Sequence, residues 1–580
     1  MPLFVEELTK SVLESGVPAV GIPASLHDSL MARLDRLGSV RRVAQIGAAI
    51  GREFSYTLLR AVSRLSEDEL EAALGRLVSS ELVFQRGTPP DVVYAFKHAL
   101  VQDAAHGSLL RSSRQRLHAQ IAEAFEAHFP ELMDSQPELF AQHYEEAELV
   151  EKSVACWSKA GHRSAAHSAM TEAAAQFQKA LDQLALLPDT TDRKREELKL
   201  RSALGAVLRF VKGQAAPETG QAYARARKLW EQLDFPTKYL HVPYGQSRYH
   251  SYRGELDLAK RLDEDLLRVS HQRNDSSGLV LAHQACGSDQ MIVGRFASSR
   301  QHYEDALALY DPVSHHSLGH QTGSHPQVVA RAYLGFVLLC LGLPDQASTQ
   351  TNTAIAEART LANPPSLASS LMVGAMLLSL VGDNRTLHER ADELVAVAVE
   401  QGVPWWHTIG TVYRGWVKVN QGDVSEGTSL MDGGLTAYRA TGAEMWLPYH
   451  TALLARAFDI AGQIEEGLSL LDDALQLVEK TGECWFAAEL NRHKGHLLIQ
   501  QGHTEAAEEL YRKALSIARE QEAKLWELRA AASLARLWRD QGRQAEARDL
   551  LAPVYGWFTE GFDTQDLKEA KVLLDELGGA

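Results

Sequence analysis

Four histidines gather in one stretch of this 580-residue chain: His315, His316, His320 and His325. Imidazole is the commonest protein ligand for transition metals, so the stretch raises the question of a metal site. The spacing of these histidines matches no compact metal-binding motif. We therefore interpret residues 311–327 as a polar insertion that closes over neighbouring helices, and we assign no metal ligand.

Motifs for catalysis are missing from the sequence. It contains no G-x-x-x-x-G-K-[ST] loop to cradle phosphates, no H-E-x-x-H and no G-x-S-x-G. No pair of acids stands out as a metal site of the cyclase type. We expect this chain to have no catalytic residue, no cofactor and no enzyme activity of its own.

Three arginines have the spacing of a binding groove. Arg456, Arg492 and Arg536 fall in successive units of a repeat, with no acid at those positions. Guanidinium groups bind carboxylates in a bidentate manner, so one interpretation is a groove for an acidic peptide or a small anion. A solvated basic stripe explains the same pattern equally well. The helical register places these residues on the groove: Arg248, Gln284, Ser288, Trp416, Arg456, Arg492, His496, Arg536 and Arg539.

The repeat that positions them is marked by glycine. The glycines are 40 residues apart, and a small residue stands seven positions before each one. A fixed period of this length is typical of a solenoid of helix pairs. In one clear unit, Gly502 separates two amphipathic helices, and Tyr511 is expected to fill the space beside Gly495. The series is Gly342, Gly382, Gly422, Gly462, Gly502 and Gly542.

This small–Gly–Ala–aromatic–Ala pattern resembles the tetratricopeptide repeat, with a longer period. Aromatic residues also recur every 40 residues, at Trp406, Trp446, Phe486 (beside Trp485) and Trp526. We expect them to be buried plugs between units. The resemblance implies a mainly α fold: a right-handed α-solenoid of tetratricopeptide-like helix pairs, with a capping helix at Thr564–Leu577.

Composition limits the remaining possibilities. Hydrophobic residues make up 45% and charged residues 23% of the chain, as is ordinary for a folded protein. The formal net charge of −16 argues against binding to nucleic acid through bulk charge. Four cysteines lie far apart, which indicates a reduced, cytoplasmic location. The longest apolar runs, such as Ala332–Leu343, are too short to span a bilayer, and we expect no membrane contact.

The N-terminal part differs from the repeats in its predicted secondary structure. Several short helices are followed by two β-type runs, Leu82–Gln85 and Val92–Phe96, on either side of a Gly-Thr-Pro-Pro turn. This is the outline of a winged helix. The helix that would read DNA, Asp68–Ser79, carries three acids and one arginine, so we do not expect a nucleic-acid partner.

Longer segments resemble one family of bacterial regulators, the signal-transduction ATPases with numerous domains. In that family a nucleotide-binding core is followed by a winged helix and a tetratricopeptide array, and class III adenylate or guanylate cyclase domains are often fused upstream. The resemblance implies a lid remnant and linker at 1–22, a winged-helix-like domain at 23–130 and a solenoid at 131–580. ATP and Mg²⁺ are implied only for a parent protein. The segments are PLFVEEL, IPASLHDSLMARLDRL, VYAFKHALVQDAAHGSLL, Tyr310–Ala347 and the C-terminus from Leu525.

Three functions follow as expectations. The first is a non-catalytic sensor and scaffold segment of a multidomain signalling ATPase, whose solenoid binds a protein, a peptide or a small ligand. The second is the regulatory C-terminal part of an adenylate or guanylate cyclase whose catalytic domain lies upstream. The third is a DNA-binding transcriptional regulator.

Overall fold

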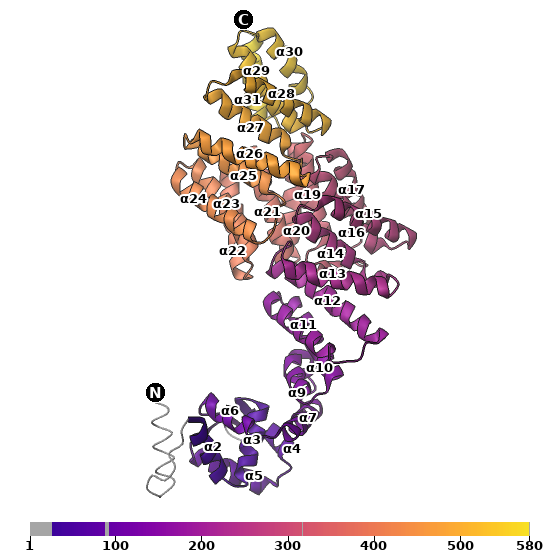
Figure 1. Cartoon of the computed structure of the whole chain (residues 1–580), viewed down its shortest axis with the longest axis vertical. Coiled ribbons are helices and arrows are strands. Elements are labelled where there is room, and N and C mark those ends of the chain that lie inside the picture. Colours follow the sequence, from indigo (N-terminus) through magenta and orange to yellow (C-terminus); the bar gives the residue numbers. More distant parts are fainter. Residues whose placement is uncertain (1–25, 88–91, 316, 579–580) are drawn as a thin grey trace. The chain divides into compact units, whose positions relative to one another are not determined.

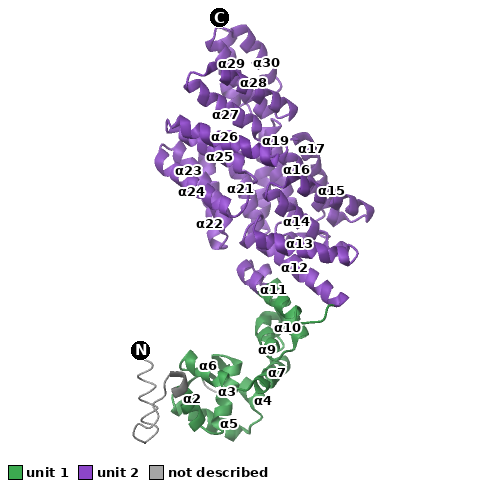
Figure 2. Cartoon of the chain, in the orientation of Figure 1, with its two compact units in different colours: residues 1–162, 176–189 green, residues 163–175, 190–580 purple. Residues whose placement is uncertain are grey.

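The computed structural model describes residues 26–87, 92–315 and 317–578, and the protein is mainly α-helical (Figure 1). The residues group into two compact units (Figure 2). Unit 1 contains residues 1–162 and 176–189, and unit 2 contains 163–175 and 190–580. The division falls within α10 (Val150–Ala166) and α11 (Met170–Leu184), later than the expected boundary at residue 130. The expected lid remnant lies outside the described residues.

Unit 1 has the order of elements of a winged helix, and its three strands form an antiparallel sheet in the order β1-β3-β2. The two longer strands confirm the predicted hairpin. The sequence did not predict β1, because three residues are too few to show an alternating pattern. The elements are α2 (Leu26–Arg36), α3 (Val40–Ile50), β1 (Glu53–Ser55), α4 (Tyr56–Ser63), α5 (Glu67–Ser79), β2 (Val83–Arg86), β3 (Val93–Phe96), α6 (Ala99–Gly107), α7 (Arg111–His128), α8 (Leu132–Ser135) and α9 (Pro137–Glu146).

Unit 2 is an array of helix pairs, visible in Figure 1 as stacked hairpins. A short helix, α18, lies inside the predicted insertion. The helices are α12 (Thr191–Val211), α13 (Pro217–Gln232), α14 (His241–Tyr252), α15 (Leu256–Gln272), α16 (Ser276–Ile292), α17 (Phe296–Leu309), α18 (Leu318–Thr322), α19 (Pro326–Cys340), α20 (Pro344–Thr360), α21 (Pro364–Val381), α22 (Asn384–Glu400), α23 (Pro404–Asn420), α24 (Val424–Ala440), α25 (Leu447–Ile460), α26 (Ile464–Thr481), α27 (Ala487–Gln500), α28 (Thr504–Glu520), α29 (Lys524–Asp540), α30 (Gln544–Tyr555) and α31 (Gln565–Gly578), with a 3₁₀ turn at Thr237–Tyr239.

The glycine series ends the first helix of each pair, as predicted. Gly382 has φ 80° and donates its N–H to the carbonyl of Leu378 at the end of α21. Gly342 and Gly502 have φ values of 84° and 83° at the same place in their units. Residues with a Cβ are strained in this left-handed conformation, so glycine is favoured there.

Within a pair, the two helices touch where the sequence places small residues. A Cβ atom built on Gly495 would lie 2.8 Å from Cε1 of Tyr511, on the facing helix. The predicted packing of Tyr511 against this glycine is therefore confirmed.

A second set of contacts, which we call the seam, joins pairs that are far apart in the sequence. The carbonyl of Phe210 at the end of α12 accepts a hydrogen bond from Nε1 of Trp405, 195 residues later, at 3.2 Å. The carbonyl of Tyr252 accepts hydrogen bonds from the N–H groups of Glu444 and Met445 at 2.8 and 3.2 Å. The carbonyl of Ile292 accepts them from Cys484 and Trp485 at 2.9 and 3.1 Å. Each of these first helices thus meets the pair five units further along the chain.

The 40-residue aromatic series packs at this seam. Trp446 and Trp526 are 2% and 0% exposed, so the prediction of buried plugs is confirmed. They lie between adjacent units, as predicted, since the ring centroids of Phe486 and Trp526 are 5.5 Å apart. They also contact units that are distant in the sequence, which the sequence did not predict. The ring of Trp406 lies 4.8 Å from that of Phe210, and Phe336 lies 5.1 Å from Trp485, measured between ring centroids. Burial of these large rings stabilises contact between distant parts of the array.

The seam also encloses an ionisable group. The carboxylate of Glu483, 2% exposed, accepts hydrogen bonds from the backbone N–H of Trp446 at 3.1 Å and from Nε1 of Trp485 at 2.9 Å. Trp446 has φ 70°, an uncommon conformation for a bulky residue, and these bonds help to hold it. Burial raises the pKa of Glu483 to about 8.

One helix, α21, is long and apolar enough to cross a membrane, alone among the helices in the described parts of the chain. The expectation that the longest apolar runs are too short to span a bilayer is therefore wrong for this 18-residue helix. In the structure 72% of its apolar stretch is buried inside unit 2, where it packs against α19, α20, α22 and α23. This is the environment of a core helix.

We predict that Gly495→Leu lowers the free energy of unfolding by about 1–3 kcal/mol, because the new side chain overpacks the contact with Tyr511. The measurement is urea unfolding of both proteins. Gly433→Leu is the matched control, since a Cβ at Gly433 meets no atom within 4 Å. Equal losses in the two variants would show that the assigned repeat register is wrong.

We also predict a pH dependence that arises from Glu483. Its folded pKa of about 8 lies above the ordinary value of 4.5, so the folded state binds more protons between these pH values. Stability contributed by the protonated group is therefore complete below about pH 4.5 and is lost as the pH rises toward 8. The measurement is thermal unfolding between pH 4.5 and 8. The Tm of Glu483→Gln should fall less with rising pH than the Tm of the parent protein. An unchanged slope would contradict the assignment.

Candidate functional site

Three successive first helices of unit 2, α25, α27 and α29, bring the predicted arginines together. Arg456, Arg492 and Arg536 line two adjoining cavities, of about 260 and 350 Å³, and Ser533 belongs to both walls. Trp416 from α23 lines the first cavity and His496 the second. We call this double concavity the arginine cavity.

The register of these residues differs from the prediction in one respect. Trp416, Arg456, His496 and Arg536 are 40 residues apart and occupy equivalent positions. Arg492 lies one helical turn before His496, on the same face of α27. The three arginines therefore share a wall without being strictly equivalent.

Arg456 differs from the other arginines of the cavity, because it has no acidic ion-pair partner among the described residues. Its guanidinium carbon lies 4.8 Å from the ring centre of Trp416, in a cation–π contact. Among the residues that the structure describes, no carboxylate forms an ion pair with it. Burial, together with the guanidiniums of Arg492 and Arg529, lowers the pKa of Arg456 to about 10. The group is still charged at neutral pH, and an anion beside it would offset the repulsion.

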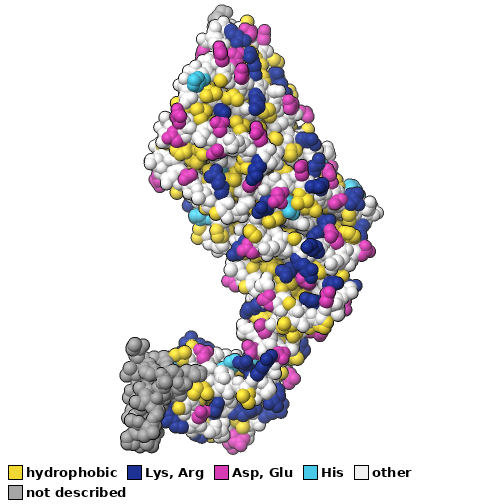
Figure 3. Space-filling view, in the orientation of Figure 1, with side chains coloured by type: hydrophobic (Ala, Val, Ile, Leu, Met, Phe, Trp, Pro, Cys, Tyr) yellow, Lys and Arg dark blue, Asp and Glu magenta, His cyan; other side chains and the backbone are white. Residues whose placement is uncertain are grey.

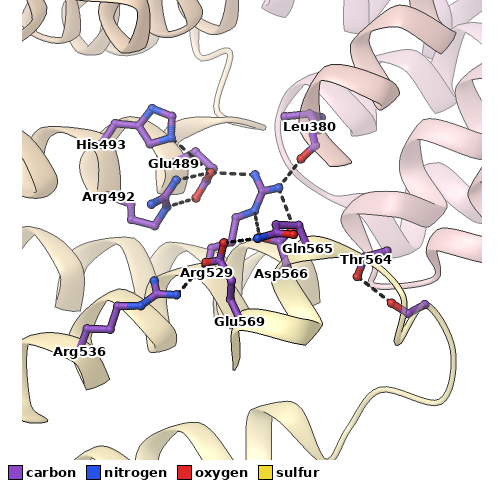
Figure 4. Close-up of polar contacts among 11 residues, drawn as sticks. Leu380, Glu489, Arg492, His493, Arg529, Arg536, Thr564, Gln565, Asp566 and Glu569 are labelled. Atoms are coloured by element: carbon purple, nitrogen blue, oxygen red, sulfur yellow. Dashed lines mark hydrogen bonds and ion pairs between the residues drawn. The ribbon is translucent and has the colours of Figure 1, made fainter. Parts of the chain in front are cut away.

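Arg492 has a partner on its own helix. Its Nε and Nη2 donate to the two carboxylate oxygens of Glu489 at 2.6 and 3.0 Å. Glu489 is 1% exposed and also accepts from Nη1 of Arg529 at 3.1 Å. Burial opposes ionisation of Glu489, but the two arginines outweigh it and hold its pKa well below the usual range. One buried carboxylate thus serves two guanidiniums (Figure 4).

Arg529 is the central residue that the sequence did not reveal. It donates from Nε and Nη2 to Asp566 of α31, both at 2.8 Å, and from Nη2 to the carbonyl of Leu380. It therefore ties together α21, α27, α29 and the last helix (Figure 4). A signal was present, since Glu489 and Arg529 are 40 residues apart and occupy the same position of adjacent units.

The capping helix α31 supplies acids to the same wall. Nη2 of Arg536 donates to Glu569 at 2.8 Å, and Arg539 pairs with Glu576. Glu569 also accepts from Gln565 at 2.8 Å. The expectation of arginines without acidic neighbours is therefore wrong for Arg492 and Arg536. Arg539, which the sequence also placed on the groove, lines neither cavity. Sequence spacing within α29 could not show which acids α31 would present to it.

His496 lies at the far side of the arginine cavity. Its Nε2 is 3.5 Å from Oδ2 of Asp459 and 3.1 Å from Nε2 of Gln500. The residue is available to a ligand, because 54% of its side chain is exposed.

Arg248, Gln284 and Ser288 do not belong to this cavity, which corrects the prediction of one continuous groove. They line a separate space of about 50 Å³. Arg248 is 5% exposed and is held by Asp263 and by Asp289, the latter at 3.0 Å. Gln284 donates to the hydroxyl of Tyr244 at 3.0 Å. Side chains therefore fill the inner wall of the array at this position. The buried guanidinium of Arg248 is paired with acids, because an unpaired charge would be costly in this environment.

His315 and His325, the two insertion histidines whose side chains the structure describes, each make their own polar contacts. His315 is 1% exposed, and its ring nitrogens contact the N–H of Asp311 at 3.0 Å and the hydroxyl of Ser276 at 2.9 Å. Nε2 of His325 is 3.0 Å from the hydroxyl of Tyr310. The side chains of His316 and His320 lie outside the described set. These contacts agree with the interpretation of a polar loop.

The surface of unit 2 carries both signs of charge (Figure 3). On the face of unit 2 drawn in Figure 3, basic and acidic side chains are interspersed. The distinguishing feature of the arginine cavity is therefore the gathering of four guanidinium groups, of which Arg456 has no ion-pair partner among the described residues.

Comparison with known proteins gives one relative in sequence. No family model matches the chain. An uncharacterized protein of Rhizobium meliloti (strain 1021) is 25% identical over 556 residues, which cover 93% of this chain and 53% of the relative. The chain thus spans about half the length of the curated relative that it matches.

Solved structures of helical-repeat proteins are similar to this one at low identity. A Rap protein complexed with Competence and Sporulation Factor is 13% identical, covers 64% of this chain and 99% of its own, and has a TM-score of 0.45. The Cut9–Hcn1 assembly gives 12% identity, coverage of 98% of both chains and a TM-score of 0.42. A signal-transduction ATPase with a tetratricopeptide sensor from Pyrococcus horikoshii gives 11% identity, coverage of 99% and 69%, and a TM-score of 0.30. The chain is a tetratricopeptide-like helical-repeat protein by its own structure, and its function must be argued from its own residues.

Proposed function

We propose that unit 2 is a binding scaffold whose arginine cavity takes an acidic segment of a partner protein or peptide. The observation that carries this proposal is Arg456, a charged guanidinium at a cavity wall. It is in cation–π contact with Trp416 and has no carboxylate partner in the described structure. Keeping such a group is unfavourable for the isolated fold, because burial and two neighbouring arginines disfavour its charge.

The chemistry of the wall selects the ligand. A guanidinium binds a carboxylate through two parallel N–H donors, and the contact with Trp416 holds the guanidinium of Arg456 at the cavity wall. Ser533 and Asn420 add neutral polar groups to the same lining. The volumes of about 260 and 350 Å³ suit one or a few acidic side chains, or a chain terminus, better than a folded surface.

A more specific proposal concerns the larger protein of which this chain would be a part. We propose that this chain is a sensor and scaffold segment, without catalysis of its own, of a larger cytoplasmic signalling ATPase. The support is the family resemblance of its sequence segments and the length of its relative, of which the chain covers 53%. ATP and Mg²⁺ would then be bound elsewhere in the parent. If that parent is an adenylate or guanylate cyclase, the chain would be its regulatory C-terminal part.

The DNA-binding alternative is less well supported. In a winged helix α5 occupies the position of the recognition helix. Its first turn carries Glu67, Asp68 and Glu69, all exposed, which would repel the phosphate backbone. We favour a role for unit 1 in linking other domains.

The test is a binding titration with a fluorescein-labelled oligoglutamate peptide, followed by anisotropy at several salt concentrations. We predict that Arg456→Gln weakens binding at least tenfold and lowers its salt dependence. The same variant should melt at an equal or higher temperature than the parent, because the unpaired charge is removed. Arg385→Gln is the control, since that arginine is 92% exposed on α22.

Equal affinity of the parent and Arg456→Gln would contradict the proposal, as would an equal loss in Arg385→Gln. A clear drop in the melting temperature of Arg456→Gln would mean that Arg456 has a structural role instead.

A further inference from the structure

A second group of chemically competent side chains lies on another part of unit 2. α16 and α17 form one helix pair, and His283 on the first faces His302 and Asp305 on the second. His302 and Asp305 are three residues apart, so they project from the same face of α17. Sequence spacing does not reveal this group, because its members come from two helices, whereas the histidines at 315–325 are close together in the sequence.

The distances between the ligand atoms fit a shared ion. Nδ1 of His283 lies 3.1 Å from Nδ1 of His302 and 3.6 Å from Oδ2 of Asp305. All three ligand atoms lie within 4.8 Å of one another. A tetrahedral ion with metal–ligand bonds of 2.0–2.1 Å separates its ligand atoms by about 3.3 Å. Small side-chain movements therefore suffice to place the three atoms around one centre.

The two imidazoles present the same ring nitrogen to each other. Nδ1 of His283 and Nδ1 of His302 lie 3.1 Å apart, within hydrogen-bond distance, so at least one of the two nitrogens has a free lone pair. A ring nitrogen binds a metal through this lone pair, and the proton of the neutral ring is then carried on Nε2.

The surroundings orient the ligands and leave the ion accessible. Oδ1 of Asp305 accepts a hydrogen bond from Nε2 of Gln301 at 2.9 Å, which fixes the carboxylate and directs Oδ2 toward His283. The ring of His271, on α15, stands edge-on to that of His283 at 6.4 Å between centroids. The side chain of Asp305 is 39% exposed, so water or a partner's side chain can supply a fourth ligand.

We propose that His283, His302 and Asp305 form a binding site for a divalent transition ion of the zinc class, with two nitrogen ligands, one carboxylate oxygen and one open position. Two imidazoles and a carboxylate are a ligand set suited to Zn²⁺ and Co²⁺ and poorly suited to Ca²⁺ or Mg²⁺, which prefer oxygen. The ion cross-links α16 to α17, so binding also stabilises this pair.

The experiment uses the full chain without an affinity tag, treated with a chelator and then dialysed. Co²⁺ is titrated while visible absorption is recorded, and Zn²⁺ is titrated by calorimetry at pH 7. We expect one equivalent of Co²⁺ to give the absorption of a tetrahedral site, and Zn²⁺ to displace it. His302→Ala and Asp305→Asn should each lower the affinity for Zn²⁺ at least tenfold.

His388→Ala is the matched control. His388 and Asp392 lie 3.6 Å apart on one helix, but no second histidine completes a three-ligand group around them among the described residues. This variant should bind as the parent does. Circular dichroism checks that each variant is folded. If His302→Ala is unfolded, the affinity of Asp305→Asn for Zn²⁺ alone tests the proposed site. Absence of cobalt absorption in the parent, or unchanged affinity in a folded His302→Ala or Asp305→Asn, overturns the proposal.

Discussion

The contact on which unit 2 depends is the seam between helix pairs five units apart. Carbonyl groups at the ends of α12, α14 and α16 would be unsatisfied helix termini in an open solenoid. Here they accept hydrogen bonds from residues 405, 444–445 and 484–485, and large aromatic rings are buried alongside. The inner side of the array is thereby filled over much of its length. Arg248, which an open groove would expose, lies instead between two aspartates.

The arginine cavity lies where this packing gives way to the last units. Arg529 reaches the carbonyl of Leu380 on one side and Asp566 of α31 on the other. The acids of α31 and Glu489 neutralise three of the four guanidiniums, and Arg456 is left over. A ligand that brings a carboxylate to Arg456 would give this fourth guanidinium an ion-pair partner.

Local features of this protein are readable in its sequence, and long-range ones are not. The glycine period predicts the helix ends, and the contact of Tyr511 with Gly495 follows from the repeat pattern. The seam does not follow from it, because its position depends on the small rotation added by each unit over 195 residues. For the same reason the helical register predicted that both Arg248 and Arg456 face the groove. In the structure Arg248 is buried and Arg456 lines a cavity. The pairing of Arg536 with Glu569 depends on where α31 docks, and no spacing within α29 encodes that.

Hydrogen–deuterium exchange resolved to short peptides tests the central claim, that the array closes on itself through the seam. The amides of Met445 and Trp485 precede or begin helices and would exchange quickly in an open solenoid, since helix starts lack internal partners. In the structure they donate to Tyr252 and Ile292. We predict that they exchange as slowly as the buried helices α19 and α21. Exchange as fast as in the exposed turns at Gly422 and Gly502 would contradict the account.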